Sequence, residues 1–132
     1  MRTLVVDASA LGALVFGEPQ AEEISQAISD ATLVAPALLW FEMAAVAAKK
    51  IRLHPEQASQ MRTAFSLAFR LPVAIKEVDY GETVNLALSS DLTTYDASYL
   101  WLEDRLGTEL VTLDAKLGRI AKGNKGQKKK PN

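Results

Sequence analysis

Residues 3–7, Thr3-Leu4-Val5-Val6-Asp7, decide the fold. Four consecutive residues that favour strands, three of them aliphatic, predict a short strand buried on both faces, which is typical of parallel sheets. The aspartate follows at the carboxyl end of that strand. In open parallel sheets ligands bind at the carboxyl ends of the strands. The chain therefore begins with a strand that delivers an acid to the expected ligand-binding edge.

Further along the chain, short apolar segments alternate with amphipathic ones. The remaining predicted strands are 32–34, 73–75 and 109–112, and the predicted helices are 9–16, 20–29, 37–51, 54–70, 79–90, 94–106 and 114–121. Pro55 suits the first turn of a helix, Asp79 suits an N-cap, and Gly107 suits a helix end. This alternation predicts an α/β fold whose parallel sheet is covered by helices on both faces.

The composition excludes several kinds of site. The chain has 132 residues, enough for one domain with a sizeable core, and 48% of them are hydrophobic. The absence of cysteine excludes disulfides, thiol nucleophiles and cysteine-ligated metals. The single histidine, His54, excludes a His-rich metal site. Catalysis would therefore rest on carboxylates, hydroxyls or lysines.

No segment has the pattern of a membrane span or of a cleaved signal peptide. The longest stretch without a charged residue is 31–41, which is well short of the roughly 20 apolar residues that a helix needs to cross a bilayer. Asp7 interrupts the apolar run that follows Arg2. A cytoplasmic protein is the default expectation.

The net charge of −1 conceals an acidic body and a basic tail. Residues 122–132 contain five lysines and no acid. Without those lysines, 10 of the 15 basic residues remain against 16 acidic ones, a net charge of −6. Such a body would repel nucleic acid unless cations or a local basic surface intervene.

Four carboxylates lie where a parallel sheet would bring side chains together. Asp7 and Asp114 follow strands, and both could instead be helix N-caps. Glu42 is the only charged residue between Asp30 and Lys49, although it could lie on an exposed helix face. The fourth carboxylate, Asp96, lies in the first turn of a helix, where the helix dipole alone would favour it.

Together the four acids predict a metal site. Carboxylates at close range repel one another and raise one another's pKa values unless cations lie between them. Ligands that are all oxygen select hard cations such as Mg²⁺ or Mn²⁺. Magnesium commonly shares its site with substrate phosphates, so the cluster indicates metal-assisted phosphodiester or phosphoryl chemistry.

The chain resembles the PIN-domain ribonucleases, and specifically the VapC-type toxins of toxin–antitoxin pairs. The matching segments are Val5-Val6-Asp7-Ala8-Ser9-Ala10-Leu11, the helix that carries Glu42, Tyr95-Asp96-Ala97-Ser98-Tyr99 and Val111-Thr112-Leu113-Asp114. The resemblance implies a three-layer α/β/α fold and an acidic cluster that binds Mg²⁺ or Mn²⁺. It also implies cleavage of RNA to a 3′-hydroxyl and a 5′-phosphate, a cognate antitoxin and a homodimer. Which RNA is cut, tRNA or rRNA, stays open.

The resemblance also implies roles for individual residues. Asp7 and Asp96 would be the principal metal ligands, and Glu42 and Asp114 would bind directly or through water. Ser9 and Thr112 would orient the carboxylates, although Ser9 could simply cap a helix and Thr112 could reflect strand propensity. The PIN domain would cover residues 1–121 and leave 122–132 as a disordered basic tail. Because this tail is polar where the family has a fifth, edge strand, we expect four strands and leave a fifth open.

Two surfaces are candidates for partners. Residues 43–76 contain six basic side chains and one acid, so Lys49, Lys50 and Arg52 are candidates for binding RNA, with ordinary solvated surface as the alternative. An apolar groove for an antitoxin or a second protomer could be formed by Leu39, Trp40, Met43, Phe65, Leu67 and Phe69, although such stripes are more often core.

Two other functions remain open. One is a PIN-like module that binds RNA or protein without cleaving. The other is an aspartate-dependent phosphotransferase, which is less favoured because Ser9 stands where that class has its second aspartate.

Overall fold

The computed structural model describes the backbone of residues 2–129 and the side chains as far as Gly123. The elements follow one another as β1 (Arg2–Val6), α1 (Ala8–Val15), α2 (Ala21–Ala27), β2 (Ala31–Ala35), α3 (Leu38–Leu53), a 3₁₀ turn (Pro55–Gln57), α4 (Ala58–Ala68), β3 (Val73–Ile75), α5 (Tyr80–Ser90), α6 (Thr94–Leu106), β4 (Glu109–Val111) and α7 (Ala115–Lys129).

The strands form one parallel sheet in the order β3-β2-β1-β4. The chain moves in one direction from β1 to β3 and then crosses to the other side of β1 to place β4. The strand order therefore reverses between β1 and β4, and the carboxyl ends of these two strands flank the expected ligand crevice. Within the described residues the sheet has four strands, as predicted.

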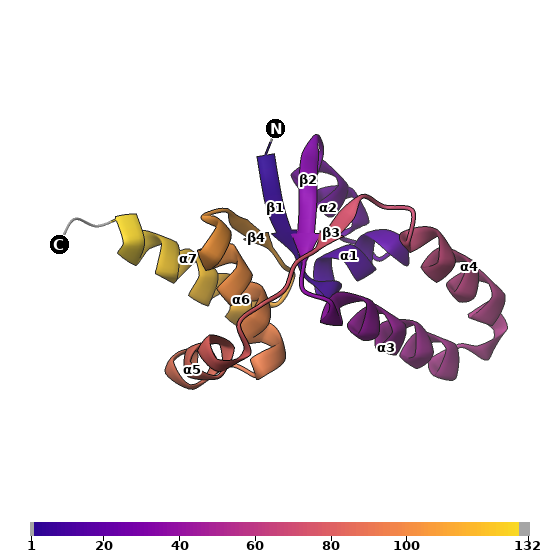
Figure 1. Ribbon diagram of the computed structural model, residues 1–132. Helices are drawn as coiled ribbons and strands as arrows, with labels where there is room; N and C mark the ends of the chain where they lie inside the picture. Colours follow the sequence, from indigo (N-terminus) through magenta and orange to yellow (C-terminus); the bar gives the residue numbers. More distant parts are fainter. Residues whose placement is uncertain (1, 130–132) are drawn as a thin grey trace.

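Helices cover both faces of the sheet (Figure 1). Helices α1 to α4 lie on one side of the strands, and α5 to α7 lie on the other. Helix α1 contacts α2, α3 and α4, while α6 contacts β1, β4, α5 and α7. The predicted three-layer α/β/α architecture is confirmed.

The core lies around β1. Leu4, Val5 and Val6 are at most 3% exposed, which confirms the strand buried on both faces. The main apolar cluster joins β1 and β2 to α1 and α3, and a smaller one joins Leu100 of α6 to Leu117 and Ala121 of α7.

Local sequence sets several element ends as expected. The Asp79 side chain accepts a hydrogen bond from the Glu82 amide and caps α5, and α6 ends at Gly107 with a positive φ of 63°. The helix predicted to begin near Pro55 begins instead with a 3₁₀ turn and becomes α-helical at Ala58.

Helix α7 extends further than predicted. It was expected to end near Ala121, yet its backbone continues to Lys129. Lysine and glutamine are good helix formers, and the next proline is at position 131, so no strong helix breaker other than glycine interrupts the segment. The helix therefore enters the segment that we expected to be a disordered tail, of which residues 130–132 lie outside the described part.

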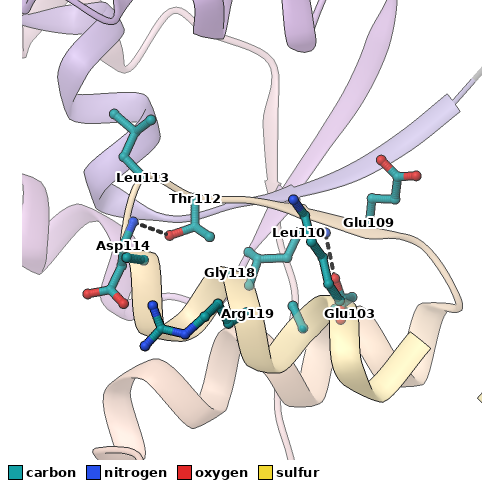
Figure 2. Close-up of a pocket in the computed structure, with 11 residues that line it drawn as sticks. Glu103, Glu109, Leu110, Thr112, Leu113, Asp114, Gly118 and Arg119 are labelled. Carbon is teal, nitrogen blue, oxygen red and sulfur yellow. Dashed lines mark hydrogen bonds between the residues drawn. The ribbon is translucent and has the colours of Figure 1, made fainter. Parts of the chain in front are cut away.

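A buried acid closes the outer side of β4 (Figure 2). Glu103 of α6 is 4% exposed, and its Oε2 accepts a hydrogen bond of 2.7 Å from the Leu110 amide. Because β1 occupies the other side of β4, this carboxylate binds an amide on the edge of the sheet.

Candidate active site

Asp7 lies at the centre of the site. It directly follows β1, is 5% exposed, and accepts the Ala10 amide at 3.0 Å as the N-cap of α1. Its Oδ1 also accepts the Ser9 hydroxyl at 2.7 Å, and its Oδ2 accepts the Thr112 hydroxyl. The carboxylate thus caps α1 and is also buried at the carboxyl ends of β1 and β4, where the strand order reverses.

Ser9 and Thr112 both contact Asp7. Each hydroxyl has one hydrogen, and each donates it to Asp7, so the 3.3 Å separation of their oxygens is a contact between acceptors. The same oxygens accept backbone amides from beyond β4: Ser9 accepts Leu113 at 2.9 Å, and Thr112 accepts Asp114 at 3.0 Å (Figure 2). The two side chains therefore tie the end of β1 to the loop after β4.

Glu42 comes from α3, which follows β2, the strand that flanks β1 on the side away from β4. It lies near the start of α3, and Phe41 before it is 83% exposed. Its Oε1 accepts the phenol of Tyr99 at 2.6 Å. Tyr99 is 1% exposed on α6, so this hydrogen bond joins helices from the two outer layers.

The other two acids begin helices. Asp96 lies in the first turn of α6, and its amide donates to the side chain of the N-cap Thr93 at 3.0 Å. Asp114 is exposed, and its Oδ1 accepts the Leu117 amide at 2.7 Å at the start of α7. Helix capping, considered from the sequence as an alternative for Asp114, is what this contact provides.

Burial and mutual repulsion raise three pKa values. Burial raises the pKa of Asp7 most strongly, Asp114 raises it further, and the hydrogen bonds from Thr112, Ser9 and Ala10 oppose the rise. Burial also raises the pKa of Glu42, which Asp96 and Asp7 increase and the Tyr99 hydrogen bond opposes.

Asp96 completes this coupling. Burial raises its pKa, Asp114 and Asp7 add to the rise, and Thr93 and Lys116 oppose it. Asp114 thus acts on Asp7 and Asp96, and these two act on Glu42, which places the four acids in one electrostatic unit.

The carboxylates are the type of ligand that a hard cation prefers, but they are not arranged around a single ion position. In the described part of the chain, no three acids or histidines are placed so as to hold a metal ion. A carboxylate offers about four lone-pair directions, and three hydrogen bonds occupy those of Asp7. One direction therefore remains for a ligand at a position where neighbouring carboxylates already repel one another.

A hollow opens beside Glu42. Its volume is about 610 Å³, and Glu42 is the acid among its lining residues Ala37, Leu38, Phe41, Glu42, Ala45 and Tyr95. Phe41 and Tyr95 are 83% and 63% exposed. Apolar and aromatic walls next to an acid suit a flat organic group better than a free ion.

The three basic residues predicted to bind RNA have different surroundings. Lys49 and Arg52 are exposed on α3, whereas Lys50 forms an ion pair with Glu18 and lies 6.0 Å from the centre of the Phe16 ring. Lys49 is seven residues after Glu42, which is about two helical turns and places both residues on one face of α3.

The predicted apolar groove is wrong in part. Leu39 and Met43 are fully buried core residues, because they face the sheet layer from α3. Phe69 and Leu67 are 55% and 50% exposed. The Phe69 ring packs against Trp40 and Phe65, with centroids 4.7 and 5.1 Å away.

Comparison with known proteins agrees with this geometry. The model of the PIN domain family matches residues 4–123. The chain belongs to the PIN-domain family. It is 36% identical over 122 residues to Ribonuclease VapC3 from Pyrobaculum aerophilum, an alignment that covers 86% of this chain and 91% of the relative. The fold is similar to the crystal structure of PAE2754 from Pyrobaculum aerophilum, with a TM-score of 0.70, 26% identity, and coverage of 88% of this chain and 82% of the other. These findings confirm the resemblance to VapC-type PIN proteins.

Two residues of this PIN-domain site were not singled out from the sequence. Tyr99 was quoted within a matching segment but received no role, and Thr93 was overlooked. The first-turn position of Asp96 implied an N-cap residue three positions earlier, so Thr93 could have been found. Nothing local indicates that Tyr99 meets Glu42, which is 57 residues away in the sequence.

No helix in the described residues is both long and apolar enough to cross a membrane.

Proposed function

We propose that this PIN-domain protein is a metal-dependent endoribonuclease and the toxin component of a toxin–antitoxin pair. The observation that carries the proposal is the electrostatic coupling of Asp7, Glu42, Asp96 and Asp114 at the reversal point of the sheet. The similarity to a protein named Ribonuclease VapC3 supports RNA as the substrate.

The four acids would share the work of holding Mg²⁺ or Mn²⁺. We assign Asp7 and Asp96 as the principal ligands, and Glu42 and Asp114 as ligands bound directly or through water. Ser9 and Thr112 would fix the rotamer of Asp7 through their hydrogen bonds to its two oxygens.

The chain's own contribution is to hold the acids near one another in an ordered, partly buried site. A divalent cation, when bound, supplies a water of lowered pKa and polarises the scissile phosphate. Burial makes ionised Asp7 costly until such a charge arrives, so the free site is held in a state that favours cation binding. Lys49, with Arg52 further along α3, would contact RNA phosphates.

The proposed partners follow from this activity. The substrate would be RNA, either tRNA or rRNA, and a cognate antitoxin would cover the site. We also propose a homodimer, and we expect the protein in the cytoplasm, where its substrate is. The domain would comprise residues 1–121.

One observation favours a second candidate, a PIN-like module that binds RNA or protein without cleaving it. As the side chains stand, no three acids or histidines among the described residues are placed to hold an ion. If they do not close around a cation, the same surface would bind RNA without hydrolysis.

A nuclease assay separates the two candidates. Purified protein is incubated with a mixed tRNA and rRNA substrate in 5′-labelled form, with Mg²⁺, with Mn²⁺ or with excess EDTA. We expect discrete fragments that carry 3′-hydroxyls with either metal and none in EDTA. Binding without cleavage in either metal would select the second candidate, and cleavage that persists in EDTA would exclude metal catalysis.

A further inference from the structure

Tyr99 is a core residue with a polar group aimed at the site. Its side chain is 1% exposed, and its phenol is the donor in the 2.6 Å hydrogen bond to Glu42 Oε1. A buried tyrosine needs a partner for its hydroxyl. Here the partner is an acid of the proposed metal site instead of a backbone carbonyl.

The geometry fixes the direction of this hydrogen bond. The Tyr99 hydroxyl donates to Glu42 Oε1 at 2.6 Å, and a carboxyl oxygen is the acceptor. Because Tyr99 is 1% exposed and belongs to the main apolar cluster, the core holds its ring in place. The contact therefore joins a fixed donor to an acid of the proposed metal site.

The placement of Tyr99 links two acids. It follows Asp96 by three residues on α6, so the two lie on one face of that helix. Glu42 comes from α3 on the opposite side of the sheet. Because α6 is anchored against β1 and β4, a glutamate bonded to Tyr99 inherits a fixed position relative to Asp96.

The bond leaves half of the Glu42 carboxylate available. Tyr99 binds Oε1, so Oε2 points elsewhere while rotation of the group is restrained. Restraint of a ligand before the cation arrives is what such supporting contacts provide in metal sites.

We propose that Tyr99 is a positioning residue that holds Glu42 for the divalent cation. The inference rests on the proposed function. It predicts that loss of the phenol hydroxyl weakens metal binding through Glu42 and through no other ligand.

The test is a double-mutant cycle read by metal binding. Mn²⁺ affinity is measured by calorimetry for the wild-type protein, Tyr99→Phe, Glu42→Gln and the double variant, in the absence of RNA. Tyr99→Phe keeps the ring and removes the hydroxyl. Tyr80→Phe serves as the matched control, because Tyr80 is 82% exposed on α5.

We expect Tyr99→Phe to raise the Kd for Mn²⁺ about 10- to 100-fold, the usual cost of losing a contact that supports a metal ligand. The same change in the Glu42→Gln background should alter the Kd less than twofold, since the two residues act as a unit. Cleavage by Tyr99→Phe should recover when Mn²⁺ is raised to saturation. Tyr80→Phe should match wild type.

Three results would overturn the inference. An unchanged Mn²⁺ affinity in folded Tyr99→Phe assigns the hydroxyl to packing alone. If Tyr99→Phe raises the Kd for Mn²⁺ equally in the Glu42→Gln background, the hydroxyl supports another ligand. A variant that does not fold in metal-free buffer assigns the hydroxyl to the stability of the core. By contrast, if the wild-type protein binds no Mn²⁺, the proposed metal-dependent function is itself contradicted, and the inference about Tyr99 is contradicted with it.

Discussion

The carboxyl edge of the sheet and the part of the α3–α4 hairpin that follows Glu42 (residues 43–68) both concentrate charge, but they hold it differently. At the edge, Asp7 is held by side chains that come from α1 and from the loop after β4, and Glu42 is held by α6. On the hairpin, Lys49 and Arg52 project from one helix into solvent. Burying acids and holding them with distant parts of the chain is costly, and titratable groups perturbed in this way are candidates for function.

The largest effect on activity is expected for Asp7→Asn, which changes the buried acid at the carboxyl edge. Asparagine keeps the volume and the capping ability of aspartate but removes the negative charge. We expect RNA cleavage to fall about 10³-fold or more, the scale of losing a central catalytic group, with the fold retained by circular dichroism.

Asp79→Asn is the matched control for that variant. Asp79 caps α5 as Asp7 caps α1, yet it is exposed and lies outside the acidic cluster. Cleavage should stay at the wild-type rate. Equal losses in the two variants would mean that Asp7 acts only as a helix cap.

Thr112→Val tests the hydroxyls that hold Asp7. The change is nearly isosteric and removes a donor to Asp7 and an acceptor for the Asp114 amide. We expect the Mn²⁺ affinity to fall about 10- to 100-fold.

Thr108→Val controls for a lost threonine hydrogen bond in the same region. Thr108 donates to the Thr3 carbonyl at the opposite end of β4. Its replacement should lower the free energy of unfolding by about 1 kcal/mol and leave Mn²⁺ affinity unchanged. Similar metal affinities for the two variants would contradict the role of Thr112.

A smaller effect is expected on the hairpin, where Lys49→Glu and Lys50→Glu should differ. Measured in the inactive Asp7→Asn background, Lys49→Glu should weaken RNA binding and reduce the salt slope by about 1 to 2, because one phosphate contact is replaced by repulsion. Lys50→Glu should mainly lower Tm, since Lys50 is paired with Glu18. If Lys49→Glu and Lys50→Glu reduce the salt slope equally, Lys50 contacts RNA in spite of its ion pair with Glu18.

The smallest effect concerns pH. Burial raises the pKa of Asp7 above its ordinary value of 3.8 and that of Glu42 above 4.5. The stability that these groups contribute is therefore fully present below those ordinary values and is lost as pH rises through the raised ones. In EDTA, the Tm of the wild-type protein should therefore fall more than that of Asp7→Asn as the pH rises above 3.8, the ordinary pKa of Asp7.

The Tm values of the two proteins should therefore diverge as the pH rises, with that of the wild-type protein falling further. Saturating Mn²⁺ should reduce the difference, because the cation binds the folded, ionised site. Parallel pH profiles of wild type and Asp7→Asn in EDTA would contradict the raised pKa of Asp7.

Much of the fold could be predicted because its local signals agree. The buried β1 segment, the Asp79 cap and the terminal Gly107 each produce a pattern within a few residues, and each is found in the structure. The end of α7 was missed because lysine-rich sequence favours both solvation and helix. The groove was misassigned in part because the period of α3 does not reveal which apolar side faces the sheet.

The site was predictable as a set of acids but not as a network. Asp7, Asp96 and Asp114 follow from strand ends and helix starts, which are local features. The Tyr99–Glu42 hydrogen bond and the Thr112–Asp7 bond join residues 57 and 105 positions apart. Such pairings depend on how the layers meet, and a single sequence does not encode that in any local pattern.

The buried Glu103 has a consequence for how molecules of this protein meet one another. An edge strand with free amides is a template on which another chain can add a strand, and this is a common route to aggregation. The outward amide of Leu110 is already bonded to the buried Glu103 carboxyl group, so an incoming strand would have to displace that group. In the described chain, the β4 edge of the four-stranded sheet is thereby less open to strand addition at Leu110.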